Sequence, residues 1–104
     1  MKFLMWVCVD PELVGTAEDA PDDWVALAGS RRLEGSQLRP VGDATTLWPR
    51  DGGTFVSDGP FAETKEQIAG YDILECADLA EAIDIAAAHP VAKFGAIELR
   101  PVWA

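Results

Sequence analysis

The sequence predicts a single α+β domain in which one antiparallel sheet carries two helices on the same face. Strand-like apolar stretches stand near both ends of the chain, and helix-like stretches alternate with strands between them. The 104 residues are 49% hydrophobic and 25% charged, which is typical of a folded globular domain. A domain of this size buries roughly two-thirds of its unfolded surface, so we expect a partner subunit to contribute to any pocket.

The first strand is expected over residues 2–9, which are continuously apolar, as in a strand that is central in a sheet or covered on both faces. The first helix is expected to begin near Pro21, with two aspartates at its positive N-terminal end. Gly29 or Gly35 ends this helix. Its apolar face consists of Trp24, Leu27 and Ala28.

The middle of the chain predicts a β-hairpin. Extended segments over 38–40 and 44–48 precede a turn at 51–53, which leads into residues 54–56. A further strand is expected over 71–76, after a second turn at 58–60. Its apolar side chains are Tyr71, Ile73 and Cys76, and they interleave with Asp72 and Glu75. A strand with one partly wet edge or face fits this pattern.

The second helix has the clearest start signal in the chain. Asp78 is the expected N-cap, and Glu81 three residues later completes a capping-box-like pattern. The predicted apolar face consists of Leu79, Ala82, Ile83 and Ala86. His89 and Pro90 end the helix, and an alternating strand follows over 96–103.

The order strand, helix, hairpin, strand, helix, strand is that of a ferredoxin-like sandwich. Both helices then pack on one side of the sheet and leave its other face uncovered. An exposed apolar sheet face is commonly buried against a second copy, so a homodimer is expected.

Charge and composition exclude several classes of partner. The formal net charge is −10, with no concentrated basic patch, so we expect no nucleic acid and no anionic membrane as partner. The apolar stretch 2–9 is too short to span a membrane or to serve as an export signal. Cys8 and Cys76 have no CxxC spacing; they are buried thiols or, alternatively, a redox or disulfide pair. A reducing cytoplasm fits this pattern better.

Residues 58–67, DGPFAETKEQ, followed by IAGY at 68–71 and DLAEA at 78–82, resemble the signature of the DGPF family of YCII-related proteins. The resemblance extends to GSQLRP at 35–40, ATT at 44–46 and IELRPV at 97–102. It implies a dimeric α/β barrel built from ferredoxin-like domains, and a functional link to a sigma factor. More distant YCII-related proteins resemble enzymes, with a suspected pocket His-Asp pair and a dehydrochlorinase among them.

The only histidine, His89, lies at the end of the second helix, so that His-Asp pair is not carried over to this chain. A cation at this position complements the helix dipole and caps the last carbonyl groups of the helix. A structural role is therefore expected for His89.

Asp58 and Phe61 are the candidates at the mouth of a pocket, with Asp58 as general base or ligand anchor and Phe61 as an apolar wall. Alternatively, Asp58 forms a turn by accepting downstream backbone N–H groups. Lys65 with Arg39 or Arg100 offers donors to a small carboxylate. Alternatively, Lys65 is a solvated neighbour of two glutamates.

These residues predict a small dimeric protein that binds an acidic or aromatic metabolite, or a regulatory partner linked to a sigma factor. The alternatives are a cofactor-independent enzyme of isomerase, lyase or dehydrochlorinase type with Asp58 as acid/base, and a scaffold for a larger assembly. No cluster with metal-ligand spacing and no phosphate-binding glycine loop is present in the sequence, so neither metal nor cofactor is expected.

Overall fold

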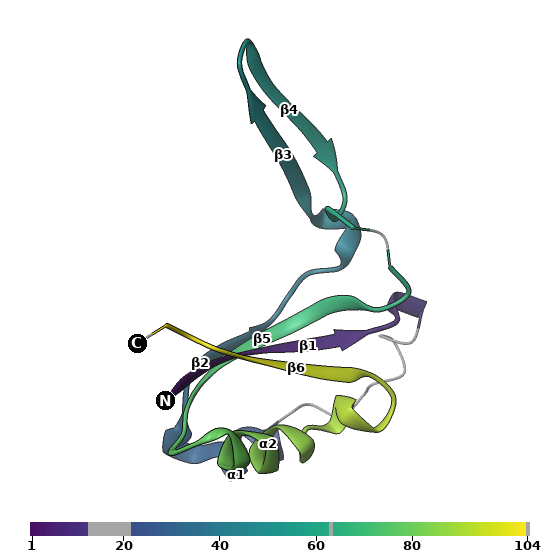
Figure 1. Ribbon diagram of the computed structural model, residues 1–104. Helices are drawn as coiled ribbons and strands as arrows, with labels where there is room; N and C mark the ends of the chain where they lie inside the picture. Colours follow the sequence, from purple (N-terminus) through teal and green to yellow (C-terminus); the bar gives the residue numbers. More distant parts are fainter. Residues whose placement is uncertain (13–21, 63, 104) are drawn as a thin grey trace.

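The main sheet has four antiparallel strands in the order β2-β5-β1-β6 (Figure 1). A computed structural model describes residues 1–12, 22–62 and 64–103. The sheet strands are β1 (Lys2–Val9), β2 (Arg32–Gln37), β5 (Gln67–Glu75) and β6 (Ala96–Pro101). Helices α1 (Asp22–Ala28) and α2 (Leu79–Ala87) both lie on one face of this sheet. The predicted α+β fold, with an antiparallel sheet and two helices, is confirmed.

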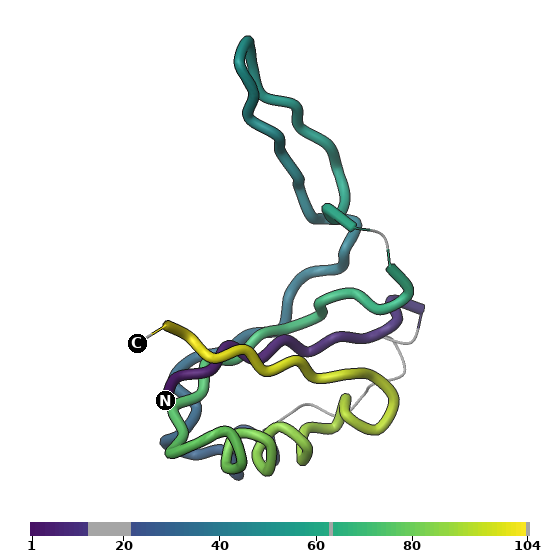
Figure 2. The backbone as a smooth tube through the Cα atoms, in the orientation of Figure 1, coloured from purple at the N-terminus to yellow at the C-terminus, as the bar shows by residue number. Residues whose placement is uncertain are grey.

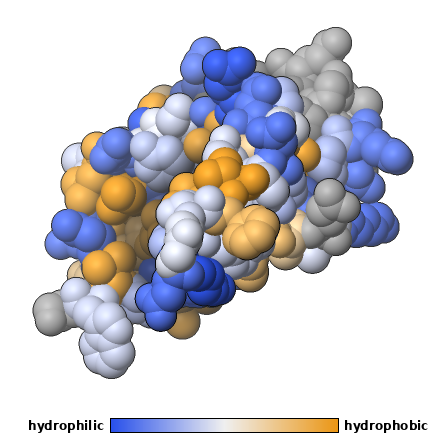
Figure 3. Space-filling model, turned by 90° about the horizontal axis from the view of Figure 1, so that it is seen from above, coloured by the Kyte–Doolittle hydropathy of each residue, from blue (hydrophilic) through white to orange (hydrophobic). Residues whose placement is uncertain are grey.

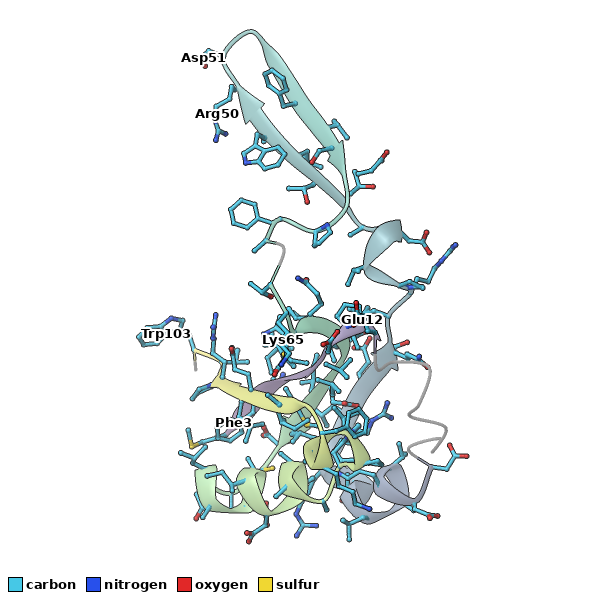
Figure 4. All side chains as sticks on the ribbon, turned by 90° about the vertical axis from the view of Figure 1, so that its right-hand side faces the viewer. Phe3, Glu12, Arg50, Asp51, Lys65 and Trp103 are labelled. Atoms are coloured by element: carbon cyan, nitrogen blue, oxygen red, sulfur yellow. The ribbon has the colours of Figure 1, made fainter. Side chains whose placement is uncertain are left out.

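Strand β1 is central, as its continuous apolar sequence predicted. It pairs with β5 on one side and with β6 on the other. Phe3 lies between the sheet and the helices (Figure 4), and Met5 and Val7 are buried on the same side. Leu4 and Trp6 point to the opposite face and are only half-buried. The helix-covered face therefore holds the core, and the other face is open.

The core consists of side chains from the sheet, from α1 and from α2. Its buried members are Phe3, Met5, Val7, Trp24, Ala28, Leu74, Cys76, Ala82, Ile85 and Ala86. The indole nitrogen of Trp24 donates a hydrogen bond of 2.8 Å to the carbonyl oxygen of Ile85, which joins the two helices. Cys8 and Cys76 are both free thiols.

The predicted hairpin is confirmed as β3 (Thr45–Arg50) and β4 (Gly53–Asp58), which form a separate two-stranded sheet. We call it the arm, because it projects from the body of the molecule (Figures 1 and 2). Arg50 and Asp51 lie at its tip (Figure 4). Gly52 has a φ of 94°, which glycine adopts without strain. Figure 3 looks down on the arm and shows hydrophobic atoms among hydrophilic ones at the surface.

Two extended segments were assigned wrongly. Residues 38–40 lie in a loop before the short 3-10 turn η3 (Val41–Asp43), and the strand that the sequence did not reveal is β2. The last strand ends at Pro101 rather than at residue 103, and Trp103 is fully exposed. Gly29, with a φ of 56°, follows α1 as expected, whereas Pro21 lies outside the described residues.

The buried faces of β5 and α2 also differ from expectation. Asp72 is buried on the helix-covered side, because it pairs with Met5 and directly opposed residues share a face. On α2 the buried residues are Ala82, Ile85 and Ala86, so the helix packs through its alanines. Leu79 and Ile83 are each about half exposed at the outer side of that helix. None of the described helices is long and apolar enough to cross a membrane.

The predicted N-cap of α2 is confirmed and gives a stability prediction. The Asp78 side chain accepts the Glu81 N–H at 2.9 Å, and the Glu81 carboxylate accepts the Ala77 N–H at 3.0 Å. We expect Asp78→Ala to lower the free energy of unfolding by about 1 kcal/mol, because an N–H of the first turn loses its acceptor. Urea unfolding measures this loss. Asp84→Ala, the same change in the exposed middle of α2, is the control, and an equal loss there would contradict the capping role.

Candidate functional site

A cavity of about 150 Å³ lies between the sheet and the helical layer. Its lining is mostly apolar and includes Val7, Val9, Trp24, Val25, Val91 and Phe94, and the uncharged polar residues in it are Ser36 and Gln37. The charged or titratable side chains in its wall are Arg32, Asp72 and His89. An apolar cavity of about this volume accommodates a molecule such as benzene. We call it the inner cavity.

Asp72 and Arg32 form an ion pair in the cavity wall, in which Asp72 is buried and Arg32 is partly exposed. Arg32 Nε lies 2.7 Å from Asp72 Oδ1, so the charged donor reaches across from β2 to β5. Only 6% of Asp72 is exposed. Burial raises the pKa of its carboxyl group above the usual value, and the Arg32 guanidinium opposes that rise only in part. The carboxylate is therefore held in place by one cation in an otherwise apolar setting.

Gly35 makes room for this ion pair. It pairs with Asp72 across the β2–β5 ladder. A Cβ atom at Gly35 would collide with Asp72 Oδ1 and would come within 2.7 Å of Arg32 Nη2. A residue with no side chain therefore lets the carboxylate lie against the backbone of β2.

His89 also lines this cavity, where α2 ends and the short 3-10 helix η4 (Pro90–Lys93) begins. Its Nδ1 accepts the Val91 N–H at 3.1 Å, and its ring lies 4.9 Å from the Trp24 ring in an edge-on arrangement. Burial lowers the pKa of the imidazole below its usual value, with Asp72 opposing the shift. The imidazole is therefore neutral at neutral pH, and its proton resides on Nε2.

His89 makes a structural hydrogen bond, as expected, but not the expected one. It does not act as a cation on the carbonyl groups of α2, because its ring accepts a hydrogen bond from η4 instead. It also shares a cavity with an aspartate, Asp72, although its place at a helix end gave no sign of this. The alternation of side chains along β5 was the one sequence signal that could have placed Asp72 in the cavity. It does so only if Asp72, rather than its neighbours, is assigned to the face that the helices cover.

Asp58 lies at the end of β4 and is exposed. The following turn is held by other groups: the Gly59 N–H donates to the Ala44 carbonyl at 2.7 Å, and Thr46 Oγ1 donates to the Gly59 carbonyl at 2.8 Å. Gly59 has a φ of 100°. No described residue donates a hydrogen bond to the Asp58 carboxylate. Its role in a site stays a prediction.

Arg39 and Phe61 both line an open hollow of about 750 Å³ at the base of the arm. Arg39 also pairs with Asp43 at 3.1 Å, and the Phe61 ring lies 6.1 Å from that of Trp48. Lys65 is exposed beside this hollow without lining it (Figure 4). Arg100 lies apart on β6, where it pairs with Glu98 at 2.8 Å. The structure thus brings two of the predicted cationic and apolar residues together and leaves the other two separate.

Within the described ranges, no group of three or more His, Cys, Asp or Glu side chains is arranged to hold a metal ion.

Comparison with known proteins gives a family and one relative. The family model described as "YCII-related domain" matches residues 1–104. An uncharacterised protein of Rhizobium meliloti (strain 1021) is 45% identical over 71 residues, which cover 64% of this chain. The matched region spans 56% of that relative's own length. The similarity thus gives a family without an activity.

The close approach at Gly35 gives a second stability prediction. We expect Gly35→Ala to lower the free energy of unfolding by about 1–3 kcal/mol, because the added methyl group must displace the Asp72 carboxylate or the Arg32 guanidinium. Urea unfolding measures the change. Gly42→Ala is the matched control, since a Cβ at Gly42 meets nothing within 4 Å, and we expect it to stay within about 0.5 kcal/mol of wild type. Equal effects of the two substitutions would contradict the role of Gly35.

The neutral state of His89 gives a pH prediction. Its folded pKa lies below the unfolded value, so the unfolded chain takes up more protons below about pH 6.5. We therefore expect the free energy of unfolding to fall as the pH decreases from about 6.5 through the folded pKa of His89. Asp72 has the opposite sign, because its raised pKa favours the folded state at low pH.

Urea unfolding of wild type and His89→Gln across this range isolates the histidine contribution, since the Asp72 contribution is common to both. The difference between the two slopes should vanish well above a pH of about 6.5, where the histidine is neutral in both the folded and the unfolded state. Proton NMR measures the pKa of His89 directly, because the chain has a single histidine. Titration of His89 above its usual pKa would contradict the prediction.

Proposed function

Because the chain belongs to the YCII-related family, we propose that it is a small-molecule-binding domain whose ligand occupies the inner cavity. The observation that carries this proposal is the Arg32–Asp72 pair with its buried carboxylate, beside a neutral histidine. Ligand sites are typically apolar hollows with a few convergent polar groups, and the inner cavity has this composition.

Stability alone explains the ion pair poorly. Replacing a buried ion pair with apolar side chains of similar volume is often neutral or stabilising. A carboxyl group with a raised pKa in an apolar cavity is instead typical of a functional site. The pair and Gly35, which accommodates it, therefore support a binding role.

The ligand class expected from the sequence, a small acidic or aromatic metabolite, stays a prediction for the hollow at the base of the arm. There Arg39 and Phe61 are the lining candidates, and Asp58, Lys65 and Arg100 stay predictions outside that lining. A regulatory partner linked to a sigma factor likewise stays a prediction of the family resemblance.

A second candidate function is cofactor-independent acid–base catalysis of isomerase, lyase or dehydrochlorinase type. The observation that favours it is the raised pKa of Asp72, a carboxyl group that faces the cavity beside His89. In this proposal Asp72 takes the acid/base role that the sequence had suggested for Asp58.

We also propose that the ferredoxin-like domain forms a homodimeric α/β barrel through the open face of its sheet. Leu4 lies opposite Ile73 and Trp6 lies opposite Tyr71, so two apolar cross-strand pairs occupy the middle of that face. Burial of such a surface by a second copy supports a dimer.

A cavity-filling variant tests the binding function. We expect a small aromatic compound at about 100 times its dissociation constant to stabilise the wild type by about 2.7 kcal/mol, which a thermal-shift assay reports as a Tm increase of several degrees. Val25→Phe should abolish the shift, because Val25 lines the cavity from α1. Leu27→Phe, at a position 60% exposed on the same helix, is the control and should keep the shift.

A panel in which no compound stabilises the wild type would contradict the proposal, and so would equal shifts in Val25→Phe. Light scattering on the same samples measures the molar mass in solution and so tests the proposed dimer. Conversion of a bound compound that is lost in Asp72→Asn would assign the second function.

A further inference from the structure

Two side chains of the cavity wall each have one polar atom without a hydrogen-bond partner among the described residues. Asp72 uses Oδ1 for Arg32, and His89 uses Nδ1 for the Val91 N–H. Among the described residues nothing bonds to Asp72 Oδ2 or to His89 Nε2, yet no fully buried side-chain nitrogen or oxygen there lacks a partner. Both residues line the inner cavity, so these two atoms are the candidate polar contacts for a ligand there.

These two atoms offer one donor and one acceptor. Because Nδ1 of His89 accepts a hydrogen bond, the neutral ring carries its proton on Nε2, which donates. Asp72 Oδ2 is an acceptor. A hydroxyl group is the smallest function that satisfies both, since it donates one hydrogen bond and accepts another. A water molecule offers the same chemistry, so a ligand hydroxyl replaces it without loss of hydrogen bonds.

The charges of the cavity wall select against an ionised ligand. Arg32 is the only Lys or Arg side chain among the described lining residues, and Asp72 neutralises it at 2.7 Å. A carboxylate ligand would bring a second anion close to Asp72 in a largely apolar space, with no further cation to offset it. Ser36 and Gln37 also line the cavity, but they are uncharged, and most of the remaining lining residues are apolar.

We propose that the inner cavity takes an uncharged ligand with a ring-sized apolar body and one hydroxyl group, which donates to Asp72 Oδ2 and accepts from His89 Nε2. This inference rests on the proposed binding function and names the chemical class of its ligand. It differs from the acidic ligand that the sequence predicted.

Three ring compounds of similar size test the inference at neutral pH. Phenol is uncharged and carries the hydroxyl group, fluorobenzene has nearly the same shape without a donor, and benzoate is an anion. Dissociation constants come from NMR titration of the ¹⁵N-labelled protein, read at the amides of Val91 and Gly35, which lie beside the two polar groups. We expect phenol to bind about tenfold more tightly than fluorobenzene, and benzoate to leave both amides unshifted.

Two variants assign any preference to the cavity. His89→Phe should reduce the preference for phenol over fluorobenzene, because the Nε2 donor is lost. Asp84→Asn, which changes an exposed carboxylate on α2 that does not line the cavity, should leave all three dissociation constants unchanged. The ligand series itself requires no change in the ion pair, so it gives a result even where His89→Phe does not fold.

The outcomes separate this inference from the proposed function. Equal binding of phenol and fluorobenzene would overturn the hydroxyl specificity and leave the binding function standing. Tighter binding of benzoate at the same amides would overturn the selection against charge. Absence of binding by all three compounds would overturn the inference together with the function on which it rests.

Discussion

The ion pair between Arg32 and Asp72 connects an edge strand to the interior of the molecule. It bridges β2 and β5 on the side of the sheet that the helices cover, where most contacts are apolar. Its position requires a glycine at residue 35 and places charged groups in the wall of the inner cavity, which His89 also lines. The strand pairing, the close backbone approach and the candidate site thus share one physical cause.

Local sequence patterns were sufficient to predict the elements whose formation depends mainly on nearby residues. The apolar run of β1 and the Asp78 cap of α2 identify a central strand and a helix start without any tertiary information. Strand β2 was not predicted, because its sequence RLEGSQ combines charged residues with a glycine and shows no alternation of apolar and polar side chains. Its strand conformation depends on pairing with β5. The buried face of β5 was not predicted correctly, because an acidic side chain is rarely buried. The pairing of Asp72 with Met5 shows which face of the strand is directed to the core.

The site was harder to predict than the fold because its residues come from separate elements. Arg32, Asp72 and His89 belong to β2, β5 and the end of α2, and only the sheet order brings them to one cavity. The sequence directed attention to residues 58–65 because a contiguous motif is visible there. That segment lies at the end and base of the arm, outside the inner cavity. The contiguous motif identified the family, whereas the cavity is formed by residues that are distant in the sequence and close in space.

The central place of β1 has a consequence for the order of folding. Residues 2–9 pair only with segments 67–75 and 96–101, so the sheet closes through contacts that are distant along the chain. Such contacts slow folding, because the entropy of closing long loops is lost before pairing offsets it. The arm needs only a short turn and forms its ladder locally. Strand β1 therefore pairs only after β5 and β6 are available, whereas the ladder of the arm needs no segment that is distant along the chain.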